Sequence, residues 1–361
     1  MRSFARPRVV VSKCLEFAAC RYNGAMISDP FVRQLKAHVD FQPVCPECEI
    51  GLGVPRDPIR IVEAGGARHF EPTREGPVAP PPSAVRESGC GSAPPRAAVP
   101  QYSDMLLVQP ATGRDVTDAM RRFAGGFVAG LGAVDGFILK GRSPSCGIKD
   151  VKLWPGPDAE SPCGKTTGLF AEAVLGRFSD LAVEDEGRLR KFVLREHFLT
   201  KLFTLAEFRE LSAPGAATMG GLVAFHARQK GLLMAYSEAQ ARALGRIVAN
   251  HGNRPAAEVL ASYRLLLAKA LARPPRVTAI MNVLMHALGH VSDGLAPAEK
   301  AFFLDTLEKY RAGKVPLSAA TAVLKSWAIR FRAANLLDQT FLEPYPEALV
   351  EITDSGKGRD A

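Results

Sequence analysis

The first half of the chain alternates short apolar runs with longer amphipathic stretches. The apolar runs are bounded by small, polar or turn-forming residues, which predicts buried strands at Arg8–Ser12, Phe41–Val44, Ile59–Val62, Gly136–Leu139 and Leu181–Val183. Apolar residues at helical spacing predict helices at Asp29–Val39, Asp115–Leu131 and Leu169–Phe178. This alternation of strand and helix is typical of an α/β domain built on a parallel sheet.

From about Glu186 onward the pattern becomes helical and remains so to the end. Apolar residues recur every three to four positions in seven stretches: Phe192–Leu205, Leu222–Ala235, Ser237–Asn250, Ala256–Leu271, Thr278–His290, Ala296–Arg311 and Pro316–Leu336. We therefore predict an α/β domain over residues 1–188, an all-α domain over residues 189–345 and a tail over residues 346–361.

One segment of the first half has no periodicity. Residues from about 67 to 102 are rich in Pro, Gly, Ser and Arg, and they include the run Pro80, Pro81 and Pro82. Such a composition predicts a disordered or loosely attached insertion. Cys90 lies in this segment without a nearby partner, so we expect it not to ligate a metal.

Composition and charge indicate which classes of protein the chain could belong to. Apolar residues make up 47% of the 361 positions, as in a chain that folds around a core, and no apolar run approaches the length of a membrane span. The N-terminus has no signal-peptide core, which predicts a cytoplasmic protein. In a reducing compartment, the odd number of cysteines, 7, indicates thiolate chemistry or metal ligation. The net charge of +9 favours anionic partners, nucleic acid included.

Three cysteines follow predicted strands, namely Cys14, Cys45 and Cys146. Because the carboxyl ends of parallel strands line one crevice, we expect these thiols to converge. Basic residues that would stabilise thiolates surround them in sequence: Lys13, Arg21, Lys140, Arg142 and Lys149. Three thiolates suit an iron–sulfur cubane with one unligated iron, or zinc with one open position; the alternative is that all three are merely small buried residues.

Five motifs around these cysteines occur in a recognisable order. They are VSKC (Val11–Cys14), CRYNG (Cys20–Gly24), CPE (Cys45–Glu47), GLGVPR (Gly51–Arg56) and KGRSPSCG (Lys140–Gly147). Together they resemble the thiouracil desulfidase family over roughly residues 6 to 188, apart from the insertion. The resemblance implies a bacterial enzyme with a Rossmann-like fold and a [4Fe–4S] cluster held by Cys14, Cys45 and Cys146.

The same resemblance implies catalytic roles. It places a catalytic glutamate at Glu47 and a catalytic serine at Ser143, with Ser145 as the second choice. The expected reaction is a non-redox desulfuration, C=S to C=O, of a small thiolated base or nucleoside. In it the open iron captures the sulfur, Glu47 activates water, and sulfide leaves or passes to an acceptor.

Two other thiols are spare candidates for ligation. Cys48 creates a C-x-x-C pair with Cys45 where the family has an apolar residue, and the CPE unit favours Cys45 as the ligand. Cys20 lies six residues after Cys14 and is expected to be a structural thiol rather than a spare ligand or sulfur relay. Cys163 is expected to be a loop thiol.

The helical half resembles the YbgA-type domain that accompanies this module in longer fusion proteins. The stretches Arg195–Phe208, Phe225–Ser237 and Asn282–Asp293 carry that resemblance. His286 and His290 are spaced i, i+4, but the H-E-x-x-H pattern is absent, so we expect packing or surface roles for both.

Two alternatives to the desulfidase remain. In the first, the protein is a nucleic-acid-associated module whose helical domain presents thiolated tRNA or damaged DNA to the N-terminal domain, with a structural metal site. The basic charge motivates this hypothesis. In the second, the protein carries a purely structural zinc site.

Overall fold

The computed structural model describes residues 3–64 and 105–351. The predicted insertion at 67–102, with Cys90, lies outside the described residues. Four strands, β1 (Arg8–Ser12), β2 (Asp40–Val44), β6 (Gly136–Leu139) and β9 (Ala182–Asp185), form a parallel sheet in the order β2-β1-β6-β9. The predicted α/β fold with a parallel sheet is therefore confirmed.

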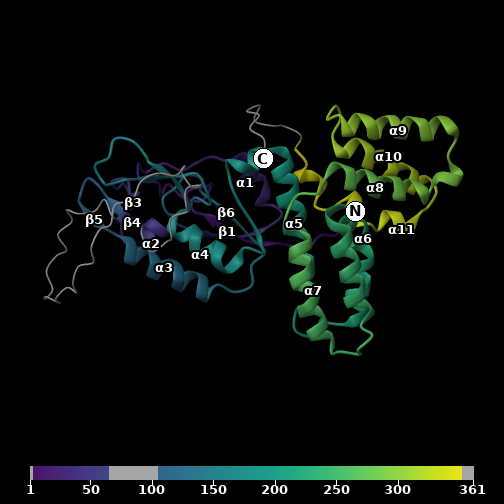
Figure 1. Ribbon diagram of the computed structural model, residues 1–361, viewed down its shortest axis with the longest axis horizontal. Helices are drawn as coiled ribbons and strands as arrows, with labels where there is room; N and C mark the ends of the chain where they lie inside the picture. The colour runs from purple at the N-terminus through teal and green to yellow at the C-terminus, as the bar shows by residue number, and fades with distance from the viewer. Residues whose placement is uncertain (1–2, 65–104, 352–361) are drawn as a thin grey trace, which may run out of the picture.

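Alternating side chains give this sheet two buried faces. Val9, Val11 and Ile138 pack on one face against α1 (Pro30–Leu35) and α5 (Phe192–Leu211). Val10 and Phe137 pack on the other, against α3 (Thr117–Gly130) and α4 (Leu169–Phe178). Helices thus cover both faces, with α3 and α4 along the lower side in Figure 1, as burial of a parallel sheet requires.

A second sheet lies beside the first, and the sequence pattern did not predict it. Its order is β5-β4-β3-β7-β8, and it mixes parallel and antiparallel pairs. The strands are β3 (Arg60–Glu63), β4 (Met105–Gln109), β5 (Arg114–Asp115), β7 (Val151–Trp154) and β8 (Gly164–Thr166). The strand predicted at Ile59–Val62 therefore exists as β3 but belongs to this mixed sheet, because its partners are β4 and β7.

The second half is helical, as predicted. Its helices are α6 (Met219–Ala249), α7 (Ala256–Ala270), α8 (Val277–Gly289), α9 (Pro297–Arg311), α10 (Leu317–Arg330) and α11 (Ala334–Leu337). The break predicted between Ala235 and Ser237 is a kink in α6, where Ser237 leaves helical geometry at φ −163°. The single helix predicted over Pro316–Leu336 is instead α10 and α11, because Arg332 has a left-handed φ of 54° between them.

The helix α5 joins the two halves (Figure 1). Its Phe198 and Leu202 share a core with Val11 of the parallel sheet, whereas its Phe208 packs against Phe225 and Tyr263 of the helical region. Residues of the last turns return to the sheet side, where Tyr345 and Leu349 join the same core as Val11. Short 3-10 helices complete the chain: η3 (Arg188–Arg190), η4 (Ser292–Gly294), η5 (Thr340–Leu342) and η6 (Glu347–Leu349).

The boundary predicted at residues 188 and 189 stays a prediction, as does the tail predicted from residue 346. No helix of the described residues combines the length and apolar character that crossing a bilayer requires.

Candidate active site

The three predicted ligand cysteines line one cavity of about 360 Å³. Cys14 lies two residues beyond β1, Cys45 directly follows β2, and Cys146 lies in the loop after β6. All three thiols are buried. Neighbouring parallel strands thus deliver residues far apart in the sequence to one edge of the sheet, as the strand pattern predicted.

The loop that carries Cys146 is fixed by backbone hydrogen bonds. The first N–H groups of α4, those of Phe170 and Ala171, donate to the carbonyl of Ser145 at 3.0 Å each. A Cβ on Gly168 would lie 2.5 Å from that carbonyl, so only glycine permits this approach. The otherwise unpaired N–H groups at the start of α4 are therefore satisfied by the carbonyl of Ser145, and these bonds hold the neighbouring Cys146 in place.

The thiols influence one another electrostatically. Burial, followed by the charges of Cys146, Cys20 and Cys45, raises the pKa of Cys14, and the nearby Lys140 opposes the rise. Burial also raises the pKa of Cys146 to about 12. Buried thiolates need a cationic partner such as iron, so this donor set is suited to a metal group and would be costly to ionise without one.

The chemistry of the donor set, three buried cysteine thiols, fits an iron–sulfur cluster. Within residues 3–64 and 105–351, no three His, Cys, Asp or Glu side chains gather closely enough to hold one metal ion. The thiolate ligands of such a cluster surround it, and Cys14, Cys45 and Cys146 line one cavity.

Glu47 points at the serines of the SPSC motif. It lies on the short helix α2 (Pro46–Glu49). Its Oε1 accepts a hydrogen bond from Ser145 Oγ at 2.7 Å and a weaker one from Ser143 Oγ at 3.4 Å. The two hydroxyls are 2.9 Å apart. Ser143 Oγ also accepts from the backbone N–H of Cys146 at 3.2 Å.

These contacts bring both predicted serines to the carboxylate. Ser145 has the shorter bond to Glu47 and is buried, whereas Ser143 is partly exposed and lines the cavity with it. Assignment of the catalytic hydroxyl to Ser143 stays a prediction, with Ser145 as the alternative.

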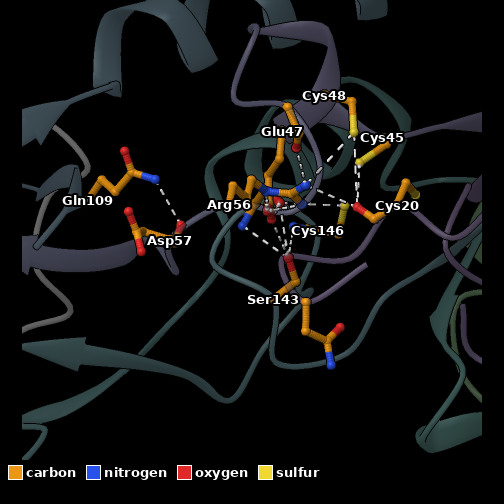
Figure 2. Close-up of polar contacts among 12 residues, drawn as sticks. Cys20, Cys45, Glu47, Cys48, Arg56, Asp57, Gln109, Ser143 and Cys146 are labelled. Carbon is orange, nitrogen blue, oxygen red and sulfur yellow. Dashed lines mark hydrogen bonds and ion pairs between the residues drawn. The ribbon is translucent and has the colours of Figure 1, made fainter. Parts of the chain in front are cut away.

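Arg56 is a site residue for which the sequence indicated no role. Its Nε donates to Glu47 Oε2 at 2.9 Å, and its Nη2 donates to the same oxygen. Figure 2 shows Arg56 between Glu47 and the cysteines, with Nη1 donating to the carbonyl of Cys20 at 3.1 Å. The only available signal was its place at the end of the GLGVPR motif.

The spare thiols lie beside Cys45. The Sγ atoms of Cys45 and Cys48 lie 3.8 and 4.0 Å from the carbonyl oxygen of Cys20. The cavity is lined by Cys20 but not by Cys48. Burial raises the pKa of Cys20 to about 12 and also raises that of Cys48. Participation of either in ligation stays a prediction.

The basic residues predicted to surround the cysteines differ in whether they line the cavity. Lys13, Arg21 and Arg142 line the cavity, while Lys149 does not. Lys140 also lines it, but its ammonium pairs with Glu186, a residue that the sequence analysis did not single out. Cys163 is exposed, with its Sγ 3.6 Å from Glu63.

The histidine pair of the helical region lines a different cavity, of about 420 Å³, with Lys230, Asn335 and Gln339. His286 also lines an adjoining cavity of about 590 Å³ with Lys269, Arg273 and Arg276. Both histidines are exposed at the surface of α8 and its end.

Comparisons with known proteins match both halves. Residues 9–79 and 86–186 match the family model of 2-thiouracil desulfurase. Residues 230–346 match the model of DUF1722, a protein family of unknown function.

A relative and a solved structure are also similar to the chain. The uncharacterized protein YbgA of Escherichia coli (strain K12) is 28% identical over 159 residues, which is 44% of this chain and 93% of YbgA. A solved structure of the [4Fe-4S]-dependent thiouracil desulfidase TudS is 22% identical, covers 51% of this chain and 93% of its own, and has a TM-score of 0.31. The first half of the chain is therefore similar to 2-thiouracil desulfurases and the helical half to YbgA and the DUF1722 family, which are the two resemblances that the motifs predicted.

Proposed function

We propose that this protein is a desulfidase that replaces the thione sulfur of a nucleobase-like substrate with oxygen, without net oxidation or reduction, and that its cofactor is a [4Fe–4S] cluster. One observation carries the proposal. Three buried cysteines from three loops line the same cavity as a carboxylate that is hydrogen-bonded to both serines of the SPSC motif. The match of this region to the 2-thiouracil desulfurase family supports it.

Cys14, Cys45 and Cys146 are the residues that would hold the cluster. When bound, it would supply a Lewis-acidic iron with an open position for the thione sulfur. The cavity of about 360 Å³ suits a small heterocycle beside such a group.

Glu47 is the general base of the proposed reaction. Its Oε1 faces the cavity and takes a proton from the water that adds to the C=S carbon. The carboxyl group then gives this proton to the sulfur, and as the C–S bond breaks and HS⁻ departs, the carboxylate takes the remaining hydroxyl proton so that C=O forms. The Ser143 and Ser145 hydroxyls share Oε1, so either can donate a hydrogen bond to the substrate while the other holds Glu47.

The test is sulfide release by the full chain. Protein reconstituted anaerobically with iron and sulfide is incubated with 2-thiouracil, 4-thiouracil and the matching nucleosides, and free sulfide and the oxo product are measured. We expect the two to form in equal amounts. A colourless protein that retains zinc and releases no sulfide from any of these compounds would contradict the proposal.

A second candidate function is binding of nucleic acid by the helical region. The two adjoining cavities of that region are lined by four cations, Lys230, Lys269, Arg273 and Arg276. Within the part of the chain that the structure describes, none of the four forms an ion pair. The acidic residue that lines these cavities, Glu238, is already paired with Arg242.

Unpaired cations around a hollow surface favour phosphate groups, and the net charge of +9 agrees with this. The proposed partner is a thiolated tRNA or a damaged DNA whose modified base enters the cysteine cavity. Binding of tRNA to the full chain, measured at 50 and 200 mM salt, tests it; failure to bind at low salt dismisses this candidate and leaves the desulfidase proposal standing.

A further inference from the structure

The carboxylate of Glu47 uses its two oxygens for different contacts. Oε1 accepts the serine hydroxyls, whereas both contacts of Arg56, from Nε and Nη2, go to Oε2. The guanidinium therefore occupies one oxygen and leaves the other directed at the serines and the cavity. A carboxylate without this constraint would rotate about its terminal torsion, which is broad in free side chains.

Arg56 is itself held from several sides. Its Nη1 donates to the carbonyls of Gly53 at 2.9 Å and Cys20 at 3.1 Å, and its backbone N–H donates to the carbonyl of Tyr22 at 2.8 Å. Its side chain is only 4% exposed. Because a guanidinium is planar and presents donors in a fixed fork, these carbonyls set the direction from which Nε and Nη2 reach Glu47.

The same contacts link the carboxylate to a ligand loop. The carbonyl of Cys20 that accepts from Arg56 also lies 3.8 Å from Cys45 Sγ and 4.0 Å from Cys48 Sγ. Figure 2 shows these residues converging on Arg56. The buried guanidinium of Arg56 thus connects Glu47 to the backbone of Cys20, which lies beside Cys45 and Cys48.

We propose that Arg56 is a positioning residue: it fixes Glu47 Oε2 so that Oε1 stays aimed at the serines and at the carbon of the bound thione. The inference rests on the proposed function, since it assigns Arg56 to the same reaction. Arg56 also lines the cavity, but its Nε, Nη1 and Nη2 are all engaged by Glu47 and by carbonyl oxygens, so it would act through the carboxylate. Its loss should therefore lower kcat and leave KM nearly unchanged.

The test compares R56K and R56A in the reconstituted full chain. We expect kcat to fall about 10-fold in R56K, which restores one donor, and about 100-fold in R56A, because misplacing a catalytic group by about 1 Å has effects of that size. Guanidinium chloride at millimolar concentration should restore several-fold activity to R56A. A merely structural arginine would show no such rescue.

Arg60 provides a matched control. It is also held by carbonyls, those of Pro157 and Ala159 at 3.2 Å each, but among residues 3–64 and 105–351 no hydrogen bond or ion pair joins it to a carboxylate. R60A should retain the wild-type kcat and show no response to guanidinium. Iron content of every variant is measured alongside, so that loss of the cluster is not mistaken for loss of positioning.

A crystal structure of R56K gives a readout that is independent of turnover: we expect the Glu47 carboxylate to leave the serine hydroxyls in part of the molecules. If R56A does not fold, R56K carries both measurements. Wild-type kcat in R56K together with an unmoved Glu47 would overturn the inference while leaving an active wild-type enzyme, whereas a wild type that releases no sulfide overturns the proposed function instead.

Discussion

The ion pairs at the cysteine cavity and the cations of the helical cavities hold their charges in opposite ways, although Lys13, Arg21 and Arg142 of the cysteine cavity are also without ion pairs among the described residues. In the cysteine cavity, the side chains of Glu47 and Arg56 are paired and 13% and 4% exposed, and Lys140 is paired with Glu186. In the helical region, Lys230, Lys269, Arg273 and Arg276 are exposed and, among the described residues, without ion pairs.

This difference separates two kinds of site. Paired and buried charges are fixed in direction, and removing one partner leaves the other uncompensated, as is typical of groups that must stay aligned during a reaction. Exposed and unpaired cations keep their hydration and mobility and suit a partner that arrives and leaves with its own counterions. We therefore expect substitutions in the first cavity to abolish chemistry and those in the second to weaken binding.

The largest expected effect comes from the three ligand candidates. C14A, C45A and C146A should each lose sulfide release by at least about 1,000-fold and most of their iron, because an iron–sulfur cluster depends on its thiolate ligands. Activity, iron and acid-labile sulfide are measured in the same preparation. C163A, which removes an exposed thiol, should behave as wild type.

The spare thiols sharpen this result. C20A and C48A should keep the cluster if Cys45 is the ligand of the C-x-x-C pair. If C45A kept wild-type iron content and turnover while C48A lost both, Cys48 rather than Cys45 would be the cluster ligand.

The next largest effect is expected at the carboxylate. E47Q keeps the size of the side chain but removes the base, so kcat should fall about 100-fold or more while iron content stays at the wild-type level. Single-turnover sulfide release at fixed cluster content measures this. An E47Q protein that is as fast as wild type would show that Glu47 serves only to hold Arg56.

The sequence was sufficient for the parts of the site that follow from local pattern. The β-branched run at Arg8–Ser12 and the run at Gly136–Leu139 gave two strands with their observed bounds, and strand direction placed Cys14 and Cys146 at one edge. The motif resemblance indicated Glu47, whose contact with the SPSC serines the structure then showed.

What the sequence missed depends on contacts between distant segments. The partners of Arg56 and Lys140, which are Glu47 and Glu186, lie nine and 46 residues away, and nothing in the local pattern indicates such pairs. The second sheet escaped because β5 and β8 are only two and three residues long, too short to show alternation, and β4 starts next to the region of no periodicity.

A smaller effect should distinguish the two serines. The short bond from Ser145 to Glu47 predicts that S145A lowers kcat about 30-fold, which is the order expected for loss of a hydrogen bond to a charged group. If the Ser143 hydroxyl contacts the substrate, S143A should lower kcat and also raise KM. Full kinetic constants for both variants and the double variant test this. Additive effects of the two substitutions would contradict the shared contact with Oε1.

In the helical region the expected effect is on binding alone. R273E combined with R276E should weaken tRNA binding about 10-fold at 50 mM salt and reduce its salt dependence, because fewer phosphate counterions are released. Turnover of free 2-thiouracil should not change. K309E, on a helix outside both cavities, is the control. Equal binding by all these proteins would remove the cavities from consideration as a nucleic-acid surface.

The junction between the two regions should respond through stability rather than function. Lys201 of α5 is 6% exposed, and burial lowers its pKa to about 8, although nearby Asp180 and Glu184 favour its charged form. Since the unfolded lysine titrates near pH 10.4, folding disfavours the ammonium, and this cost is complete below pH 8 and disappears as the pH rises toward 10.4.

K201M should therefore raise the free energy of unfolding by about 2 kcal/mol at pH 7, and the gain over wild type should shrink between pH 8 and 10. Urea unfolding of both proteins at several pH values measures it, with K300M, on the partly exposed surface of α9, as the control. A K201M protein that is less stable than wild type at pH 7 would mean that the ammonium is held by the carboxylates across the junction, and that the two regions are joined by charge as well as by the apolar face of α5.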